Sequence, residues 1–549
     1  MDKRGASINM KRNYLLLFLL WLILFSAYCS LRSHTFISAF SHDEGLFLYG
    51  GQAWANGEIP YQDFWDHKPP GTFLLHSIPL RLFPFSVTAL KLNQIFWLSL
   101  SALFLFLICK TRFSLLTTIS TIVLYMFYTS APFTIRTGGL TEESALFFVM
   151  LGFWIMLRRQ KISMLHTMLA GVAIGAAIQF RQTFVFSSIF ILGIIINNHL
   201  GSKRKWSEIW KPVLSLSCGM IIPELVISIY FLWHGVWFDY IEASYLVNFL
   251  YVGSARPSKT ITDILNIQWT FIVSSGPYLL SPILALGVMR WLPKKLRWMI
   301  VPLIINFIAE LWAISLSREY YQHYYVQASV TMSLLLAIFI EGAYCSVKSA
   351  VSGSGSLRYA IMAFTSLLLI LSLTALGLGV TQYVDDYGEI LINHAEEESE
   401  YAFQQDAARV VNHLTEADDK ILLIGRDPNS IYILAQRCAA SRFYHFSPLW
   451  KKKLLDAVTP SQQQAFLNDL QEKRPVLLLI DRRISRMLRE DRDFINSVND
   501  IIEQKYMPLE DIVDQSPEDA FFWYGSRFTI LVRNDRQKKV IERFKDLSG

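Results

Sequence analysis

Long apolar runs, separated by short charged segments, recur from Tyr14 to about residue 380. A run of about 18 residues or more, wound as a helix, is long enough to cross the hydrocarbon core of a bilayer. Hydrophobic residues make up 52% of the chain, a share typical of proteins that cross the membrane many times. About eleven spans are predicted, at residues 13–33, 86–108, 114–131, 140–157, 163–180, 183–199, 212–233, 266–289, 299–316, 327–343 and 359–380. The sequence therefore predicts a polytopic α-helical membrane protein.

Basic residues are distributed unevenly between the segments that join these runs. Four precede the first run, and others gather in every second loop after it. The basic residues are Lys3, Arg4, Lys11, Arg12, Lys110, Arg112, Arg158, Arg159, Lys161, Lys203, Arg204, Lys205, Lys211, Arg290, Lys294, Lys295, Arg297, Lys348 and Arg358. Because loops rich in Lys and Arg stay in the cytoplasm, we expect an uncleaved signal-anchor with a cytoplasmic N-terminus. The first loop and everything after about residue 380 are then expected outside.

The first loop, about residues 34–85, is polar, aromatic and rich in Pro and Gly between two apolar runs. Two short surface-lying helices are predicted in it. The first runs from Glu44 to Ala55 and ends at the cap pair Asn56-Gly57, and the second runs from about Gly71 to Leu82. Residues 1–380 are therefore predicted to form a transmembrane domain whose large first loop carries juxtamembrane helices.

Charged residues return and the periodicity becomes mixed from Gln382 onward. Buried strands are predicted at residues 420–425, 475–481 and 528–532, with amphipathic helices near 399–415, 461–473 and 491–505. Residues 381–549 are thus predicted to be a soluble, extracytoplasmic α/β domain. It shows no catalytic motif, and His413, His445 and Asp481 are interpreted as ordinary surface or strand-end residues.

Asp43 and Glu44 stand where the first apolar run ends. Asp43 as a helix N-cap and Glu44 as a first-turn acid would explain them structurally. Ionisable groups at a membrane are costly unless they serve a function. A carboxylate at the mouth of a membrane cavity can take the proton from an acceptor hydroxyl during group transfer. Both acids are therefore candidate catalytic residues, with Asp43 as the general base.

Lys68 lies in a stiff basic turn, Asp66-His67-Lys68-Pro69-Pro70. A lysine here can simply reach lipid headgroups. Alternatively, its ammonium group binds a phosphate that leaves during transfer, a role that positive charge suits. The two readings stay open on the residues alone.

Polar residues in later external loops are further candidates. Glu142 opens the fourth span beside Glu143, and Arg181 occupies the short turn before the sixth. Acids at a helix start and arginines at an interface also have plain structural explanations. We assign Glu142 to catalysis, and Arg181, Arg318 and His323, with Lys68, to phosphate binding. The predicted substrate cavity is completed by Tyr61, Asp66, His67, Tyr320 and Tyr324.

The first loop resembles a known family. DEG at Asp43–Gly45 and GEIPYQDFWDHKPPG at Gly57–Gly71 are similar to the first external loop of polyprenyl-phosphate-sugar-dependent glycosyltransferases of the GT-C superfamily. Protein O-mannosyltransferases and bacterial lipid A aminoarabinose transferases are the groups that it resembles most. Thr141-Glu142, the turn at Arg181 and the segment Tyr320–Tyr324 also resemble family positions.

This resemblance implies a GT-C-like fold in the bacterial cytoplasmic membrane. It implies inverting transfer of a sugar from a polyprenyl-phosphate donor to a hydroxyl of a glycan or lipid, with Asp43 as base, Lys68 beside the donor phosphate and Glu142 in the same cavity. Asp66-His67 precede Lys68 where the aminoarabinose transferases carry a glutamate. No cofactor is predicted, and a divalent metal stays open.

Two other functions stay open as alternatives. A lipid-linked sugar flippase would need charged residues along a path and internal symmetry between halves, whereas no repeat is found and the charges cluster on one face. An O-antigen ligase or polymerase would use a diphosphate-linked oligosaccharide donor. A nucleic-acid partner is not expected, because no basic face interleaved with aromatic residues is present.

Overall fold

The computed structural model describes residues 3–158, 162–201, 206–253, 260–352, 356–396, 398–425, 429–446, 449, 460–482 and 492–548. The chain divides into two compact units. Unit 1 comprises Met1–Phe36, Val87–Ile227 and Pro257–Gly388, and unit 2 comprises Ile37–Ser86, Ser228–Arg256 and Glu389–Gly549. Of the predicted basic loop residues, Arg159, Lys161, Lys203, Arg204 and Lys205 lie outside the described residues.

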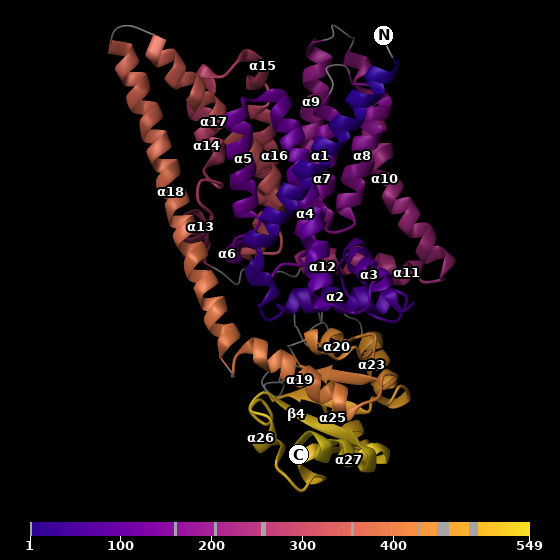
Figure 1. The fold of residues 1–549 in the computed structure, drawn as a ribbon. Helices are drawn as coiled ribbons and strands as arrows, with labels where there is room; N and C mark the ends of the chain where they lie inside the picture. Colours follow the sequence, from indigo (N-terminus) through magenta and orange to yellow (C-terminus); the bar gives the residue numbers. More distant parts are fainter. Residues whose placement is uncertain are drawn as a thin grey trace. The chain divides into compact units, whose positions relative to one another are not determined.

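Unit 1 is built from helices (Figure 1). They are α1 (Lys3–Leu31), η1 (Ser33–Phe36), α4 (Val87–Arg112), α5 (Leu115–Tyr128), α6 (Pro132–Ile135), α7 (Thr141–Leu157), α8 (Met164–Ile178), η2 (Gln182–Ser187), α9 (Ser188–Gly201), η3 (Trp206–Glu208), α10 (Trp210–Trp233), α13 (Ile261–Ser275), α14 (Ser281–Val288), η5 (Met289–Trp291), α15 (Lys294–Arg297), α16 (Ile300–Ser315), η6 (Gln322–Ala328), α17 (Ser329–Ser352) and α18 (Ser356–Ala395). The ends of α10 and α18 continue into unit 2.

Within the described residues, seven helical stretches are long and apolar enough to cross a membrane. They are Arg12–Leu31, Val87–Arg112, Gln182–Gly201, Trp210–Trp233, Lys294–Ser315, Gln322–Val351 and Tyr359–Leu414. Two further apolar helices, Leu115–Tyr128 and Met164–Ile178, are shorter. The chain is therefore a multi-pass membrane protein, and the number of eleven spans stays a prediction.

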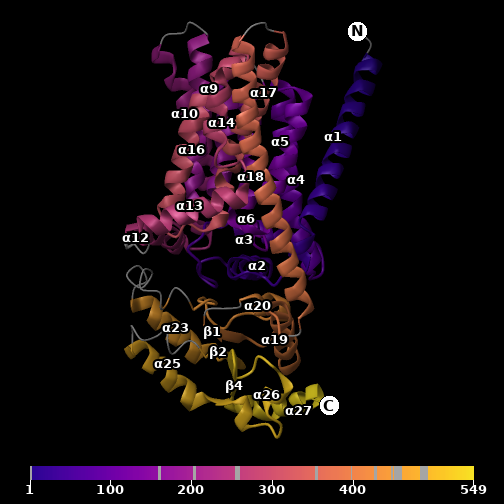
Figure 2. The same cartoon turned by 90° about the vertical axis from the view of Figure 1, so that its left-hand side faces the viewer.

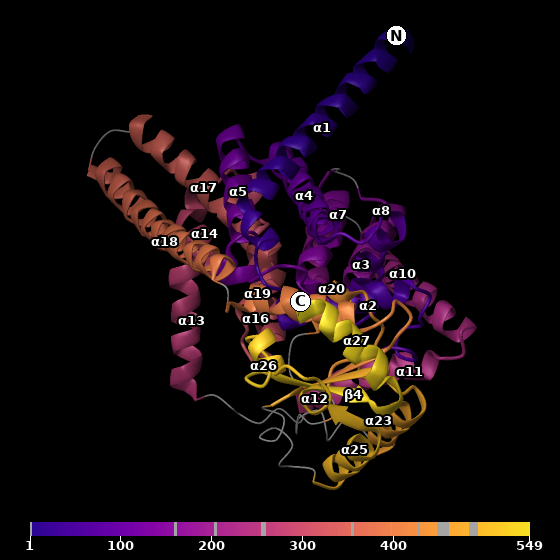
Figure 3. The ribbon, with the colours of Figure 1, turned by 60° about the horizontal axis from the view of Figure 1, so that its bottom comes forward.

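Residues 266–289 were predicted as one span but form two helices, α13 and α14, which Figure 3 shows apart. Helix α13 ends because Gly276 adopts φ +70° and ψ −145°, outside the helical region. Helix α14 restarts at Ser281 with Pro282 in its first turn, where a missing N–H is harmless. The apolar run is continuous in sequence, but its glycine and prolines interrupt the backbone.

Unit 2 contains a four-stranded sheet. Its strands are β1 (Ile421–Ile424), β2 (Leu477–Asp481), β3 (Tyr506–Pro508) and β4 (Phe528–Arg533), in the order β1-β2-β4-β3. Strand β2 runs parallel to β1, with Leu478 opposite Leu422, and antiparallel to β4, with Leu478 opposite Leu531. The three strands predicted from sequence are present. Strand β3, only three residues long, was not predicted.

Several helices accompany the sheet. They are α19 (Glu400–Leu414), α20 (Ser430–Ala435), α23 (Pro460–Glu472), α25 (Arg492–Lys505), η8 (Leu509–Asp511), α26 (Pro517–Ala520), η9 (Asn534–Arg536) and α27 (Gln537–Ser548). Helix α19 packs against α20 and α27, and α23 lies beside α25 (Figure 2). The three helices predicted in this part of the chain, α19, α23 and α25, are confirmed within one or two residues at each end.

The first loop and part of residues 228–256 belong to the same unit. They supply α2 (His42–Ala55), α3 (Gly71–Leu82), α11 (Trp237–Ile241), the π-helical turn η4 (Glu242–Leu246) and α12 (Val247–Gly253). Every residue from Glu44 to Trp54 of α2 is buried. Phe47 and Tyr49 share one hydrophobic core with Phe403 of α19 and Leu477 of β2. Both predicted helices are present: α3 has the predicted bounds, whereas α2 begins two residues before the predicted Glu44, and their position at the membrane surface stays a prediction.

The compact units therefore group the chain differently from the predicted domains. The sequence placed the first loop with residues 1–380, whereas it shares a core with residues 389–549. The predicted boundary at residue 380 falls inside α18, which runs without a break to Ala395. The domain assignment stays a prediction.

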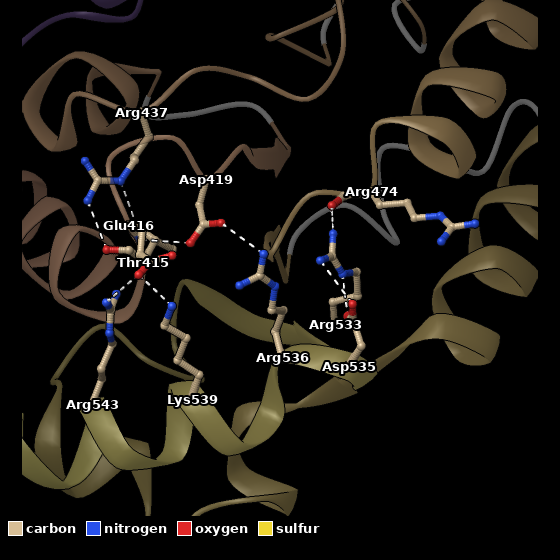
Figure 4. A network of polar contacts seen from close by, with 10 residues as sticks. All are labelled: Thr415, Glu416, Asp419, Arg437, Arg474, Arg533, Asp535, Arg536, Lys539 and Arg543. Carbon is tan, nitrogen blue, oxygen red and sulfur yellow. Dashed lines mark hydrogen bonds and ion pairs between the residues drawn. The ribbon is translucent and has the colours of Figure 1, made fainter.

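A polar network joins α27 to the segment after α19 (Figure 4). Glu416 accepts from Lys539 at 2.6 Å and Arg543 at 3.4 Å, and Arg437 donates to Thr415 Oγ1 at 2.8 Å. Hydrogen bonding from Lys539 lowers the pKa of the Glu416 carboxyl. Ion pairs this exposed contribute little to stability.

Candidate functional site

The acidic pair of the first loop forms the first turn of α2 in unit 2. The N-cap is Ser41, with φ −69° and ψ 162°, and its hydroxyl accepts from Glu44 N at 3.3 Å. The alternative in which Asp43 caps the helix is therefore wrong, because a serine in extended conformation already fills that position. Glu44 is fully buried, whereas Asp43 is half-buried. Asp43 is thus the more accessible of the two carboxylates.

Gly45, the third residue of the DEG motif, packs against the start of α20. A Cβ atom at this position would lie 2.9 Å from the backbone N of Ser430. That distance is too short for any side chain, and backbone atoms cannot easily move away. The glycine therefore lets the first turn of α2 lie directly on α20, which fixes where Asp43 sits in unit 2.

Tyr61 holds the turn that carries Asp66 and Lys68. It is fully buried and adopts φ +71°, which is uncommon for a residue with a side chain. Its hydroxyl donates to Lys68 O at 2.9 Å and accepts from Ser244 at 2.9 Å. Asn248 donates to His67 O at 2.6 Å. Tyr61 was predicted to line a substrate cavity, and these contacts show it positioning the backbone of the turn.

Asp66 lies at the centre of the turn, with 1% of its side chain exposed. Its Oδ1 accepts from Lys68 N at 3.0 Å and lies 3.3 Å from His67 Nδ1. Its Oδ2 lies 3.5 Å from the Tyr444 hydroxyl and 4.0 Å from His445 Nε2. The carboxyl is therefore surrounded by groups that can donate to it.

The electrostatics of Asp66 link the two residues that the sequence singled out. Burial raises the pKa of Asp66 to about 6, the positive charge of Lys68 opposes this rise, and the negative charge of Asp43 adds to it. Both groups must lie near the buried carboxyl, because these effects fall off with distance. Asp43, Asp66 and Lys68 therefore form one electrostatic cluster in unit 2.

His445 and Tyr444 were missed as neighbours of this cluster. The interpretation of His445 as a surface residue is wrong, because it is 5% exposed and its ring stacks on Trp65 with centroids 6.4 Å apart. Tyr444 lies 378 residues beyond Asp66 in the chain. No local pattern in the sequence indicates a contact over that separation. His413, by contrast, is exposed, and Asp481 is a buried residue at the end of β2.

The second group of predicted residues lies in unit 1, at the start of α7. Glu142 Oε1 forms an ion pair with Arg181, and Glu142 Oε2 accepts from Thr141 Oγ1 at 2.9 Å. The guanidinium carbon of Arg181 lies 3.9 Å from the ring centroid of Tyr324. The structure thus brings together three residues predicted to act at the site, and it pairs Arg181 with a carboxylate.

Glu143, beside them, makes a second buried ion pair. Its Oε1 lies 2.7 Å from Arg32, and the two side chains are 2% and 1% exposed. Its Oε2 accepts from Leu140 N at 3.1 Å and so closes the start of α7. Arg32 was not singled out from the sequence, where it reads as an ordinary residue after the first span. The pair fixes the end of α1 to α7.

The remaining candidates in unit 1 lie just before η6 and in its first residues. Arg318 and Tyr320 adopt φ +56° and +51°, a strained conformation that often marks functional segments. Arg318 is exposed, whereas His323 is 3% exposed and its ring stacks on Tyr321 with centroids 5.6 Å apart. Arg136, also at positive φ, lies over the Tyr321 ring at 5.7 Å.

A metal site was left open by the sequence. Among the described residues, no group of three or more His, Cys, Asp or Glu side chains is arranged to hold a metal ion.

Two solved structures of ArnT from Cupriavidus metallidurans are similar to this chain. The apo structure matches with 12% identity over 98% of this chain and 99% of that one, with a TM-score of 0.56. The structure bound to undecaprenyl phosphate matches with 11% identity over the same shares, with a TM-score of 0.54. No family model and no curated protein matches the sequence. The chain therefore has the fold of ArnT, a lipid A aminoarabinose transferase and GT-C enzyme, as the first-loop resemblance indicated.

Proposed function

We propose that this protein is an integral-membrane glycosyltransferase of the bacterial cytoplasmic membrane. It moves a sugar from a polyprenyl-phosphate donor to a hydroxyl of a glycan or lipid acceptor on the external face, with inversion at the anomeric carbon. The fold supports this proposal, because one ArnT structure of the same fold binds undecaprenyl phosphate. A polyprenyl tail stays in hydrocarbon, so an enzyme for such a donor has to be a membrane protein.

The observation that carries the proposal is the cluster of Asp43, Asp66 and Lys68. A glycosyl transfer needs a base for the acceptor hydroxyl and a cation for the departing phosphate, and Asp43 and Lys68, whose charges both act on Asp66, are proposed for these roles. The hydrogen bond from Lys68 N to Asp66 Oδ1 fixes the backbone of Lys68 beside that carboxyl.

In the proposed reaction, the acceptor oxygen attacks the anomeric carbon while its proton passes to the Asp43 carboxylate. The bond between the anomeric carbon and the phosphate oxygen breaks, and the polyprenyl phosphate leaves with the electron pair. Lys68 stabilises the negative charge that gathers on this phosphate. Phosphate is a good leaving group, so a general acid is not required.

The residues of unit 1 are assigned supporting roles. Arg181, Arg318 and His323 are proposed phosphate-binding residues, and Glu142 orients Arg181 through their ion pair. Tyr324, under the Arg181 guanidinium, and Tyr320 are proposed substrate-binding residues of unit 1. Among the carboxylates, Glu44 is the weakest candidate for catalysis, because it is fully buried.

A transfer assay on purified protein in lipid nanodiscs tests the proposal. Extracted envelope glycolipids serve as acceptors, and radiolabelled undecaprenyl-phosphate sugars serve as donors beside diphosphate-linked ones. We expect transfer from the monophosphate donor, and a loss of roughly 10²- to 10⁴-fold in Asp43→Asn. Lys68→Ala is expected to lose most activity, with only partial rescue in Lys68→Arg, because a guanidinium differs in shape from an ammonium.

Asp418→Asn is the matched control, because it removes one carboxylate from an exposed position in unit 2. Full activity of Asp43→Asn would refute the assignment of the base. Transfer from the diphosphate donor alone would favour a ligase, and movement of labelled donor across liposomes without any acceptor would favour a flippase.

A further inference from the structure

Unit 2 contains a cavity of about 190 Å³ that the proposed reaction does not use. Its lining residues are Trp65, Asp239, Glu242, Arg442 and Gln462. They come from the first loop, from α11 and η4, from the segment after α20, and from α23. The cavity has roughly the liquid volume of six water molecules, enough for a small polar molecule.

Gln462 contributes a buried polar side chain to the lining of this cavity. Its side chain is 5% exposed, and its Nε2 donates to Glu242 Oε1 at 2.7 Å. Its Oε1 is buried and has no hydrogen-bond partner among the described residues. A buried acceptor without a partner costs about 1–3 kcal/mol, so the amide oxygen is set to accept from a ligand.

Arg442 is fixed in the lining by its backbone. Its carbonyl accepts from Trp65 N at 2.7 Å, and its N–H donates to Asp469 at 3.2 Å. Its guanidinium lies 3.9 Å from Asp239 and 5.0 Å from the Phe443 ring centroid. Its Nε is buried and has no partner among the described residues. The cavity therefore offers a donor close to its acceptors.

The lining selects between classes of ligand. Asp239 and Glu242 give it an excess of negative charge over Arg442, which disfavours a phosphate or another anion. Its polar walls disfavour an apolar ligand. A sugar hydroxyl both donates and accepts, so it can use the carboxylates, the amide oxygen and the guanidinium together. Trp65 closes one side of the cavity and is itself 3% exposed, so the lining that a ligand meets is almost entirely polar.

We propose that this cavity binds one neutral sugar ring, and that the ring belongs to the glycan that accepts the transferred group. Sugar binding stands on the cavity alone, whereas the acceptor role rests on the proposed function. The hydrogen bond from Trp65 N to Arg442 ties the cavity to the turn that carries Asp66, the next residue in the chain. A ring held here is thus anchored to the same turn as the proposed catalytic cluster.

Saturation-transfer NMR on the full-length protein in nanodiscs tests the binding step. The probes are the methyl α-glycosides of glucose, galactose, mannose and N-acetylglucosamine, with methyl phosphate as an anionic comparison. We expect saturation of at least one glycoside and none of methyl phosphate. Gln462→Leu removes both polar atoms of the amide and should weaken binding roughly tenfold.

Glu242→Gln keeps the shape of the lining and covers the case in which Gln462→Leu does not fold. It removes one charged acceptor and should also weaken binding roughly tenfold. Asp418→Asn and Asp43→Asn should both bind the glycoside as the wild type does. Absence of every glycoside signal in the wild type, or unchanged binding in both cavity variants, would overturn the sugar site. A sugar site that binds while Asp43→Asn transfers at full rate would instead refute the proposed mechanism.

Discussion

Replacing Asp66 by asparagine tests whether the carboxyl at the centre of the turn is as buried as the structure shows. Burial raises the pKa of Asp66 from 3.8 to about 6 in the folded protein. Below pH 4 the carboxyl is neutral in both the folded and unfolded chain, so its pKa shift has no effect on stability. Between pH 4 and 6 the unfolded chain releases this proton while the folded protein keeps it. The free energy of unfolding then falls by about 1.4 kcal/mol per pH unit, about 3 kcal/mol in total.

The asparagine side chain cannot ionise, so the Asp66→Asn variant lacks this loss. We expect the difference in melting temperature, Asp66→Asn minus wild type, to rise from pH 4 to pH 6 and to level off above it. The rise should be roughly 6 to 12 °C for a folding unit of a few hundred residues. Differential scanning fluorimetry in a single detergent measures it, with Asp418→Asn as the exposed control. A melting-temperature difference that stays constant from pH 4 to pH 7 would show that Asp66 is solvated, and it would refute the electrostatic cluster.

Three further substitutions test the geometry. Arg32→Met leaves Glu143 buried without its cation and should lower the free energy of unfolding by about 3–5 kcal/mol. The double variant Arg32→Met, Glu143→Gln should recover much of this stability in a thermal melt. Equal melting temperatures of the single and double variants would argue against the ion pair. Gly45→Ala forces α2 away from Ser430 and should lower stability by about 1–3 kcal/mol, while Gly57→Ala, at positive φ but with open space around it, reports backbone strain alone. Tyr61→Phe removes the hydrogen bonds to Lys68 O and Ser244, so the turn that carries Lys68 is less well positioned. In transfer assays, kcat should fall by a larger factor than KM rises. An unchanged kcat would leave Tyr61 with a packing role only.

Local elements were predictable where the sequence marks their ends. Helices α2 and α3 stop at Asn56 and Phe83, where cap and proline signals stand in the sequence. The buried strands β1 and β2 are short continuous apolar runs, a pattern typical of strands covered on both faces. The break between α13 and α14 was not predicted, because the hydrophobic run continues across it while the helical conformation of the backbone ends.

The residue types of the site were predictable, but their partners were not. Asp43 and Lys68 could be proposed from the sequence because both stand in one loop, and the charges of both act on the pKa of Asp66. The environment of Asp66 depends on Tyr444 and His445, which tertiary folding alone brings to it. Arg181 was predicted as a phosphate ligand from its loop position, and nothing local shows that Glu142 pairs with it.

The discontinuity of unit 2 has a consequence for biogenesis. Asp66 is made 378 residues before the tyrosine that helps enclose it. At 5–20 residues per second, about 20 to 75 seconds of synthesis separate the two. Throughout that interval the first loop has left the ribosome without its core. It must then wait longer still, unshielded or chaperoned, because β2, β3 and β4 follow Tyr444 in the chain.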